Sequence, residues 1–206
     1  MRRAPAIRVI SLPEPCLVVL VGAAGSGKST LAARLFDPDG VLSSDAHRAL
    51  VAGDATDQSV TRTAFAILHK RLARRLAERR TTVVDATNVT SYARRSLVRR
   101  STNARIPAVA IVLALEPRIV RARNATRPGR IVPEAAVSRQ LDDLDRALRR
   151  DSLAAEGFDA VYLVRTAREL DELAVEWDAR KARAGYETAE GPDARPPTPI
   201  RRARLR

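Results

Sequence analysis

The chain has 206 residues, of which 45% are hydrophobic and only 3% aromatic, which suits one α/β domain with an aliphatic core. Its 37 Lys and Arg outnumber 24 Asp and Glu and leave a net charge of +13, which favours a polyanionic partner or reflects a G+C-rich coding bias. The single cysteine, Cys16, excludes an internal disulfide and fits a cytoplasmic location. No apolar run reaches the roughly 20 residues of a membrane span, so we expect no membrane partner.

The N-terminal part of the chain changes character after residue 15. Residues 1–15 hold three arginines and three prolines and are expected to form an arm, or a short edge strand at residues 7–10. Residues 17–21, Leu-Val-Val-Leu-Val, form an apolar run that predicts a buried strand. We therefore expect one folded domain over residues 16–184.

The segment that follows this strand, Gly-Ala-Ala-Gly-Ser-Gly-Lys-Ser-Thr, has the spacing of a P-loop. Its glycines let backbone N–H groups approach phosphate oxygens, and Lys28 is expected to reach the β- and γ-phosphates. The hydroxyl of Ser29 is expected to ligate Mg²⁺, and the helix opening at Lys28 points its positive end at the phosphates. The pattern predicts binding of a nucleoside triphosphate such as ATP, with Mg²⁺. The residues expected to contact it here are Gly22, Gly25, Ser26, Gly27, Lys28, Ser29 and Thr30.

Strands and helices alternate through the rest of the domain. Strands are predicted at residues 41–44, 81–84, 108–115 and 160–164, and helices at 29–35, 59–79, 91–100, 118–125, from 133, and after a capping box at 166–169. This order is typical of an α/β fold with a parallel sheet of about five strands and helices on both faces. Ligands of such sheets bind at the carboxyl ends of the strands, where Gly22, Asp45 and Asp85 all lie.

Several expectations concern burial. The apolar stripe of the helix at 59–79 predicts a core face, and its Lys and Arg form a solvated face or, alternatively, a phosphate contact. His47 and His69 are expected to face solvent. Leu170, Leu173 and Trp177, which follow the capping box, are expected to join the core. Residues 185–206 are basic and rich in Pro and Arg. They are expected to be disordered in isolation. Their role is open between a tail that binds nucleic acid, the remnant of a linker and a merely solvated end.

Asp45 is placed at the end of its strand to accept a proton from an acceptor hydroxyl, or else it caps the helix from Ala46 onward. Arg48 lies one helical turn away on the same side and suits an acceptor phosphate. Asp85 holds Mg²⁺ through water or pairs with Arg48. Thr87 and Asn88 offer side-chain hydrogen bonds to an acceptor, or serve only the turn that follows the strand.

Three arginines surround a Pro-Gly break between two predicted helices. Arg123, Arg127 and Arg130 are expected to lie on a lid at residues 123–133 and to reach the β- and γ-phosphates. The alternative is a surface loop in an arginine-rich protein. If the lid exists, these side chains stabilise charge that develops during phosphoryl transfer.

Taken in order, these segments resemble the polynucleotide 5′-hydroxyl kinases of phages and bacteria, above all the bacterial kinase modules joined to phosphatase and ligase modules. The resemblance runs from residue 17 to residue 164. It rests on the P-loop, Ser43-Ser44-Asp45-x-x-Arg48, Val84-Asp85-Ala-Thr-Asn-Val89, Arg123-Asn124 with Arg127-Pro128-x-Arg130, and Glu156-Gly157-Phe158. It implies a P-loop NTPase fold with an adenylate-kinase-like sheet.

The resemblance also implies ATP-dependent phosphorylation of a nucleic-acid 5′-hydroxyl, the end-healing step of repair. Asp45 would be the base, Arg48 the contact to the acceptor's 3′-phosphate and Asp85 the support of Arg48, while Arg123 and Arg130 would clamp the ATP phosphates. Without phosphatase or ligase modules, repair would need such partners. Two other functions remain open from the residues: a kinase for a nucleoside, sugar or other small hydroxyl compound, and a nucleic-acid-binding ATPase that phosphorylates no acceptor.

Overall fold

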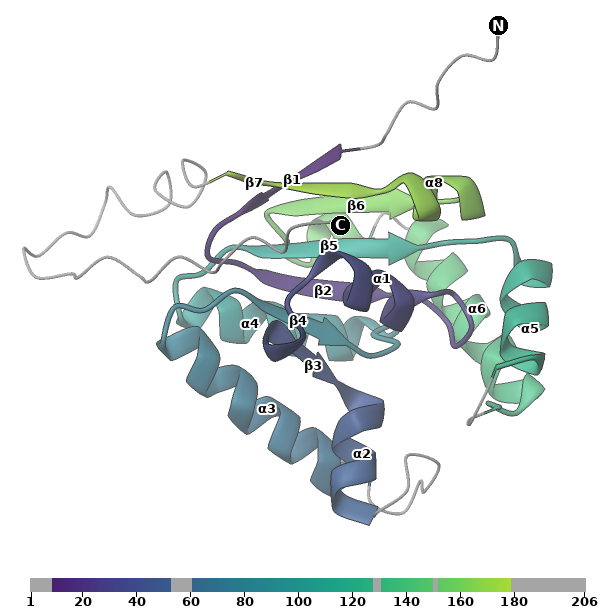
Figure 1. Ribbon diagram of the computed structural model, residues 1–206, viewed down its shortest axis with the longest axis horizontal. Coiled ribbons are helices and arrows are strands. Elements are labelled where there is room, and N and C mark those ends of the chain that lie inside the picture. Colours follow the sequence, from purple (N-terminus) through teal and green to yellow (C-terminus); the bar gives the residue numbers. More distant parts are fainter. Residues whose placement is uncertain (1–8, 53–60, 128–130, 150–151, 179–206) are drawn as a thin grey trace, which may run out of the picture.

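The computed structural model describes residues 9–52, 61–127, 131–149 and 152–178 (Figure 1). Its centre is a parallel sheet with the strand order β3-β4-β2-β5-β6, as the alternation of strands and helices predicts. The strands are β2 (Leu17–Val21), β3 (Val41–Ser43), β4 (Thr82–Asp85), β5 (Ala108–Leu113) and β6 (Ala160–Val164). Strands β2, β4 and β5 are buried on both faces, which explains their continuous apolar sequences.

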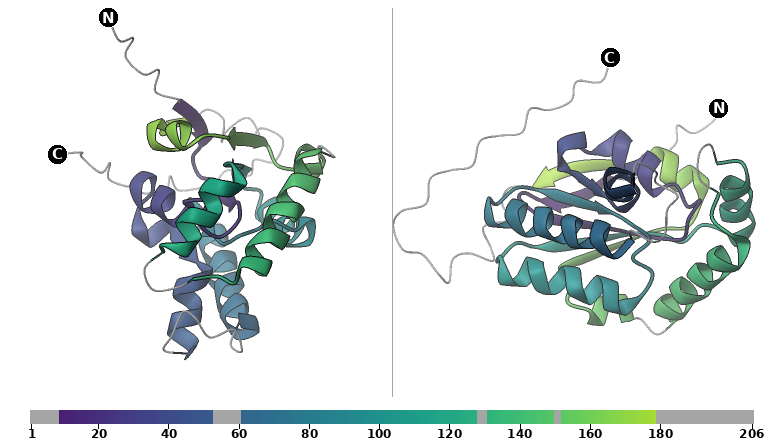
Figure 2. Two further views of the ribbon diagram at one scale, coloured as in Figure 1. Left: turned by 90° about the vertical axis from the view of Figure 1, so that its right-hand side faces the viewer. Right: turned by 90° about the horizontal axis from the view of Figure 1, so that it is seen from below.

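Helices cover both faces of this sheet. They are α1 (Lys28–Leu35), α2 (Ser44–Ala52), α3 (Thr61–Ala77), α4 (Ser91–Asn103), α5 (Pro117–Ala125), α6 (Glu134–Arg149), α7 (Ser152–Ala155) and α8 (Ala167–Glu172). Leu20 of β2 packs in the core beneath α1 and α5, whereas its neighbour Val19 packs in the core beneath α3 and α4. This alternation follows from the two-residue period of a strand. Helix α3 lies below β4 in Figure 1, α4 lies at the height of β4, and the two run side by side in the right-hand view of Figure 2.

A second, two-stranded parallel sheet pairs the two ends of the described chain. Strand β1 (Val9–Pro13) pairs with β7 (Ala174–Asp178), so the N-terminal segment does form a strand, longer than the expected one. Residues 1–8 and the basic tail at 185–206 lie outside the described residues. Tyr162 Oη of β6 donates to Ser11 O at 2.7 Å and connects the two sheets.

The spacing of Leu170, Leu173 and Trp177 does not continue as one helix. Arg34 of α1 donates to the carbonyl oxygens of Leu170 and Leu173 at 2.6 and 2.8 Å, and the chain then extends as β7. Both leucines are buried as expected, but Trp177 is 39% exposed; its ring and that of Phe36 meet edge to face, with the ring centroids 6.1 Å apart. The strand partner β1 decides this conformation, because strand pairing overrides a weak helical spacing.

Thr166 caps α8, as the capping box predicts, and its hydroxyl accepts from Glu169 N at 3.1 Å. The carboxylate of Glu169 in turn accepts from Arg165 N at 2.9 Å. Among the described residues, no helix is both long and apolar enough to cross a membrane.

Candidate active site

The P-loop connects β2 to α1 and packs directly against α5. Gly25 has φ +85°, and a Cβ atom there would lie 2.4 Å from Val120 O and 3.0 Å from Asn124 N. At Gly27, where φ is +96°, a Cβ atom would lie 2.9 Å from Cδ2 of Leu170 in α8. Both positions therefore require glycine, because an L side chain would meet backbone or core atoms in a left-handed conformation. This tight contact brings α5 and its arginines against the phosphate loop.

Lys28 is the first residue of α1 and is only 8% exposed. Its Nζ donates to Ala23 O at 2.8 Å and to Ser26 Oγ at 3.4 Å. Burial lowers the pKa of Lys28 to about 8; Asp85 acts in the opposite direction, and Arg127 lowers it further. A phosphate placed here would restore the preference for the charged ammonium group, so the site is electrostatically prepared for an anion.

Ser29 and Asp85 meet at the carboxyl edge of the sheet, where Ser29 Oγ donates to Asp85 Oδ2 at 2.7 Å. A hydroxyl and a carboxylate are hard oxygen donors, which suit Mg²⁺. Magnesium in nucleotide sites takes one or two protein ligands and completes its shell with phosphates and water. The described residues contain no group of three or more acidic, His or Cys side chains that could hold a metal, and this two-residue arrangement needs none.

Asp45 lies in the first turn of α2, within reach of Arg48 and Arg127. Its Oδ1 forms an ion pair with Nη2 of Arg48, and its Oδ2 lies 3.4 Å from Nη2 of Arg127. Asp45 does not cap α2, because Ser43 Oγ accepts the hydrogen bond from Ala46 N at 3.4 Å. The expected pairing of Asp85 with Arg48 is not made; in the described chain Asp85 is bonded to Ser29 and Arg48 to Asp45.

A pocket of about 360 Å³ lies over the P-loop, large enough for part of a nucleotide. Arg123 and Arg127 both line it from α5 and the residues that follow, and their contact with phosphates stays a prediction. Arg130 lies outside the described residues. The lining residues are Gly25, Gly27, Lys28, Ser29, Thr30, Leu31, Arg34, Arg123, Thr126, Arg127, Leu170 and Asp171.

The turn after β4 is held to the neighbouring strand β2 and to the P-loop by hydrogen bonds of Asn88 and Thr87. Asn88 is 6% exposed at φ +48°, and its amide donates to Leu20 O at 2.8 Å and to Ala86 O at 3.3 Å. Gly22 N donates to Thr87 O at 2.9 Å. The amide nitrogen of Asn88 therefore holds the turn against β2, which is the turn role that the sequence also allowed. A contact of Asn88 with an acceptor stays a prediction. The side chain of Thr87 is half-buried at the same edge.

A fully buried ion pair lies behind this turn and was not foreseen. Arg94 Nε and Nη2 donate to Glu156 at 2.6 and 2.7 Å, and its Nη1 donates to Asn88 O at 3.0 Å and Val89 O at 2.6 Å. Arg94 lies three residues before Leu97, on the buried stripe of α4, and this position was the available signal.

The expectation that His47 faces solvent is wrong, since only 2% of its surface is exposed. Its Nδ1 lies 2.7 Å from Ser43 O and therefore donates to it, which leaves Nε2 to accept from Arg71 Nη1 at 3.4 Å. The packing of α3 over α2 causes this burial, and it holds Arg71 next to the helix that carries Asp45.

Residues 17–150 match the family AAA_33, described as an AAA domain. The chain belongs to this family. Among curated proteins, none matches this AAA-domain chain by sequence.

Comparison with solved structures supports a P-loop kinase fold. A chain of the Pnkp1/Rnl/Hen1 RNA repair complex is similar at TM-score 0.57 and 21% identity, over 68% of this chain and 47% of that one. A gluconokinase from Sinorhizobium meliloti 1021 is similar at TM-score 0.51 and 21% identity, over 84% and 93% of the two chains. A putative kinase from Chloroflexus aurantiacus gives TM-score 0.53 at 16% identity, over 74% and 85%. The AAA-domain chain thus spans about half of the repair-complex chain and most of each small kinase.

Proposed function

We propose that this AAA-domain protein transfers the γ-phosphate of ATP to the 5′-hydroxyl of a nucleic acid. The observation that carries the proposal is the position of Asp45, whose carboxylate lies 3.4 Å from Arg127, an arginine that lines the P-loop pocket. A carboxylate that faces a phosphate site is not needed for nucleotide binding alone. It is useful where an acceptor hydroxyl must lose a proton.

On the donor side, the P-loop backbone and Lys28 hold the β- and γ-phosphates, and Arg123 and Arg127 reach them from the lid side of the pocket. Mg²⁺, bound at Ser29 and Asp85, would neutralise charge on the phosphate oxygens. These cations favour the transition state because they lie in place before charge develops there.

On the acceptor side, the 5′-oxygen attacks the γ-phosphorus, the bond from that phosphorus to the β–γ bridging oxygen breaks, and ADP leaves. Asp45 accepts the proton of the 5′-hydroxyl. In the ligand-free protein its two oxygens face Arg48 and Arg127. The γ-phosphate offers Arg127 a second anion, so ATP binding is expected to release one oxygen of Asp45 for the acceptor.

Arg48 is 7% exposed and is fixed beside Asp45, where its planar guanidinium suits the 3′-phosphate of the terminal nucleotide. Together with the net charge of +13, this favours a polynucleotide over an uncharged acceptor. A small hydroxyl acceptor is the second candidate, since the gluconokinase shares the fold over most of its length. Phosphatase and ligase partners would complete a repair role.

The test offers γ-labelled ATP with a 5′-hydroxyl oligonucleotide beside a panel of nucleosides and sugars, gluconate included. We expect label only on the oligonucleotide, and we expect Asp45→Asn to abolish transfer while ATP binding persists. Arg48→Ala should raise the KM for the acceptor more than the KM for ATP. Transfer to a sugar alone would support the second candidate, and near-normal transfer by Asp45→Asn would remove the proposed base.

A further inference from the structure

Helices α3 and α4 carry a charge imbalance that differs from the rest of the described surface. The sequence of α3 holds five Lys or Arg, that of α4 holds four, and neither helix contains a carboxylate. Arg75 and Arg94 are buried, but Lys70, Arg95 and Arg99 are exposed. Within the described ranges, the side chains of these three residues form no hydrogen bond or ion pair.

Arginines on the other helices are mostly neutralised locally. Ion pairs on the surface of α5, α6 and α8 join Arg118 to Glu116, Arg121 to Glu134, Arg146 to Asp143, Arg149 to Asp145, and Arg168 to Glu172. A coding bias toward arginine would raise the number of arginines on every helix. It would not explain why α3 and α4 lack carboxylates while the arginines of other helices are paired with them. On α3, Arg74 is likewise paired with Glu78, which follows the helix. The uncompensated charge of the two helices therefore lies at Lys70 of α3 and at Arg95 and Arg99 of α4.

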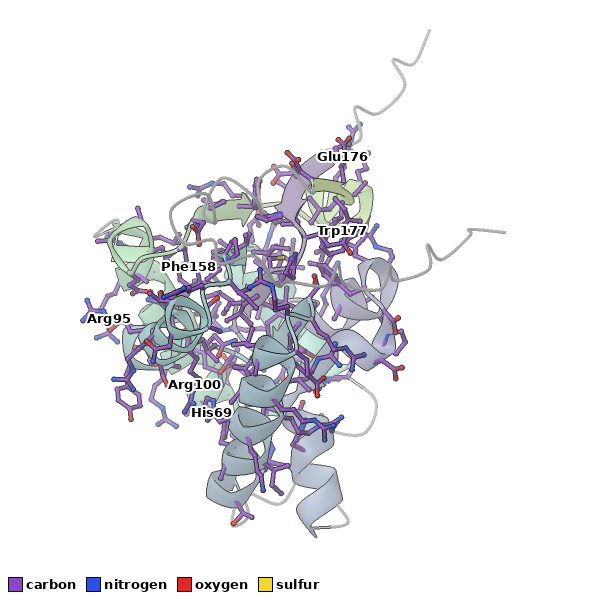
Figure 3. The ribbon with its side chains drawn as sticks, turned by 90° about the vertical axis from the view of Figure 1, so that its left-hand side faces the viewer. His69, Arg95, Arg100, Phe158, Glu176 and Trp177 are labelled. Carbon is purple, nitrogen blue, oxygen red and sulfur yellow. The ribbon has the colours of Figure 1, made fainter. Side chains whose placement is uncertain are left out.

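The two helices form one continuous face. They lie side by side in the right-hand view of Figure 2, and their inward sides share a core that contains Leu72 and Leu97. Arg100 of α4 is close enough to His69 of α3 to lower its pKa, after the larger effect of burial. Figure 3 shows His69, Arg95 and Arg100 together on this side of the molecule, with Arg95 at its outer edge.

One end of this face lies toward the carboxyl edge of the sheet, where α4 begins shortly after β4. Tyr92, Arg95 and Arg99 lie at positions i, i+3 and i+7 of α4, a stripe about 10 Å long at 1.5 Å per residue. Tyr92, at its first end, is 86% exposed and lies four residues beyond Asn88, at the carboxyl edge of the sheet. From the other helix, Arg71 contacts His47 of α2, the helix that carries Asp45.

We propose that the outward faces of α3 and α4 bind the sugar-phosphate backbone of the acceptor nucleic acid beyond its 5′ end. This inference rests on the proposed function for its orientation. Lys70, Arg95 and Arg99 neutralise phosphates, and Tyr92 stacks on a base near the reacting end. Favourable interaction of cations with helix dipoles does not account for these positions, because Lys70 and Arg95 lie before the last turns of their helices.

The experiment measures binding of a 5′-phosphorylated oligonucleotide of about 20 nucleotides, which cannot be phosphorylated again, by fluorescence anisotropy between about 50 and 200 mM salt. The test variant is Arg95→Ala/Arg99→Ala. The matched control is Arg146→Ala/Arg149→Ala, which removes the same charge from α6, where both arginines are paired with aspartates. All four side chains are exposed, so both variants should fold.

We expect the test variant to bind at least about tenfold more weakly at low salt, and its log–log salt slope to fall by about 1.4, the value for two lost contacts to a single strand. The control should change little. For catalysis, kcat/KM should fall with a long 5′-hydroxyl oligonucleotide and stay unchanged with a nucleoside 3′-monophosphate. Equal losses in both variants, or no loss in either, would overturn the surface.

Vesicles of phosphatidylglycerol and phosphatidylcholine provide a further arm. If the Arg95/Arg99 face binds these vesicles and not the oligonucleotide, the surface is a lipid contact and the proposal is wrong. If no 5′-hydroxyl is ever labelled but oligonucleotide binding still depends on Arg95 and Arg99, the proposed binding surface is supported and the proposed reaction is wrong. If the test variant labels long acceptors normally, the proposed reaction is supported and the proposed binding surface is wrong.

Discussion

Ser29 and Asp85 are 56 positions apart in the sequence, yet the hydroxyl of Ser29 donates to Oδ2 of Asp85 at 2.7 Å. The contact joins the first turn of α1 to the end of β4, whose strand pairs directly with β2. It therefore fixes the phosphate loop relative to the carboxylate at the neighbouring strand end. This geometry gives a hydroxyl and a carboxylate oxygen that one cation can share.

Replacing either member of this pair should weaken the use of Mg²⁺. Ser29→Ala removes the proposed ligand, and Asp85→Asn removes the negative charge that would attract the metal. We expect each to raise the Mg²⁺ concentration for half-maximal activity by about 10- to 100-fold. A magnesium titration of phosphoryl transfer measures this, with Asp142→Asn, an exposed carboxylate on α6, as the control. An unchanged titration curve for Asp85→Asn would exclude Asp85 from the metal site.

The buried Lys28 should give the ligand-free protein a distinctive dependence on pH. Its pKa falls from 10.5 in the unfolded chain to about 8 in the folded one, a difference of about 3 kcal/mol at 1.36 kcal/mol per unit. Between these values the unfolded state binds more protons, so unfolding becomes more costly as pH rises from 8 toward 10.5. Below pH 8 the full penalty for burying the charged ammonium is present.

Lys28→Met should remove this dependence, and the difference in unfolding free energy between the two proteins measures it. Cys16 acts in the opposite sense above pH 9, because burial raises the pKa of its thiol and the folded state keeps that proton. Both proteins should therefore carry Cys16→Ala. If the unfolding free energies of the two proteins follow parallel curves from pH 8 to pH 10, the pKa of Lys28 is not lowered in the folded protein. Added ATP should weaken this rise in stability with pH, because bound phosphates favour the charged lysine and raise its pKa toward the unfolded value.

Much of the fold was predictable because the decisive signals are local. The apolar run before Gly22 and the glycine spacing after it specify a strand, a loop and a helix within fourteen residues, 17–30. The positions of Asp45 and Arg48 followed from helical spacing, and the structure places them side by side. Whether they act as a base and an acceptor contact stays a prediction for kinetics.

The missed features all depend on contacts between distant segments. The sequence does not distinguish buried Arg94 from its exposed neighbour Arg95. The difference arises from the ion pair of Arg94 with Glu156, which lies 62 positions away. His47 is buried because α3 packs over it. Trp177 lies on a strand because β1 supplies a partner. A single sequence carries no local signal for such pairings.

Substitution by alanine should be far more damaging at the P-loop glycines than at other glycines. Gly25→Ala would put a Cβ atom 2.4 Å from Val120 O at a positive φ, so either the loop or α5 must move. We expect a loss of more than about 1 kcal/mol of stability and a larger loss of ATP affinity, because Arg123 moves with α5. At Gly40 the nearest atom is 3.6 Å away and φ is not positive. Gly40→Ala should therefore be neutral or stabilise by up to about 1 kcal/mol. Denaturation and nucleotide titration of both variants test the contrast, and similar losses would contradict it.

The buried pair of Arg94 and Glu156 is expected to position the turn after β4 rather than to stabilise the protein. Glu156→Ala leaves an unpaired buried charge and should cost about 3–5 kcal/mol. Arg94→Met/Glu156→Leu removes both charges and should cost only about 1–3 kcal/mol, the penalty for leaving the carbonyls of Asn88 and Val89 without their donor. The double variant is thus the more stable of the two.

Stability and activity should separate in this double variant. Without Arg94 the turn that follows Asp85 loses two of the bonds that hold it, so we expect kcat to fall at least about tenfold and more Mg²⁺ to be required, although the protein stays folded. Val98→Ala, one turn further along α4, is the matched control: it removes buried apolar contacts without touching the turn, and should lower stability while leaving the magnesium dependence unchanged. Urea unfolding and magnesium titration on the same samples compare the three variants. A folded double variant with normal kcat and normal magnesium dependence would show that the pair has no positioning role, because the turn would then hold Asp85 in place without it.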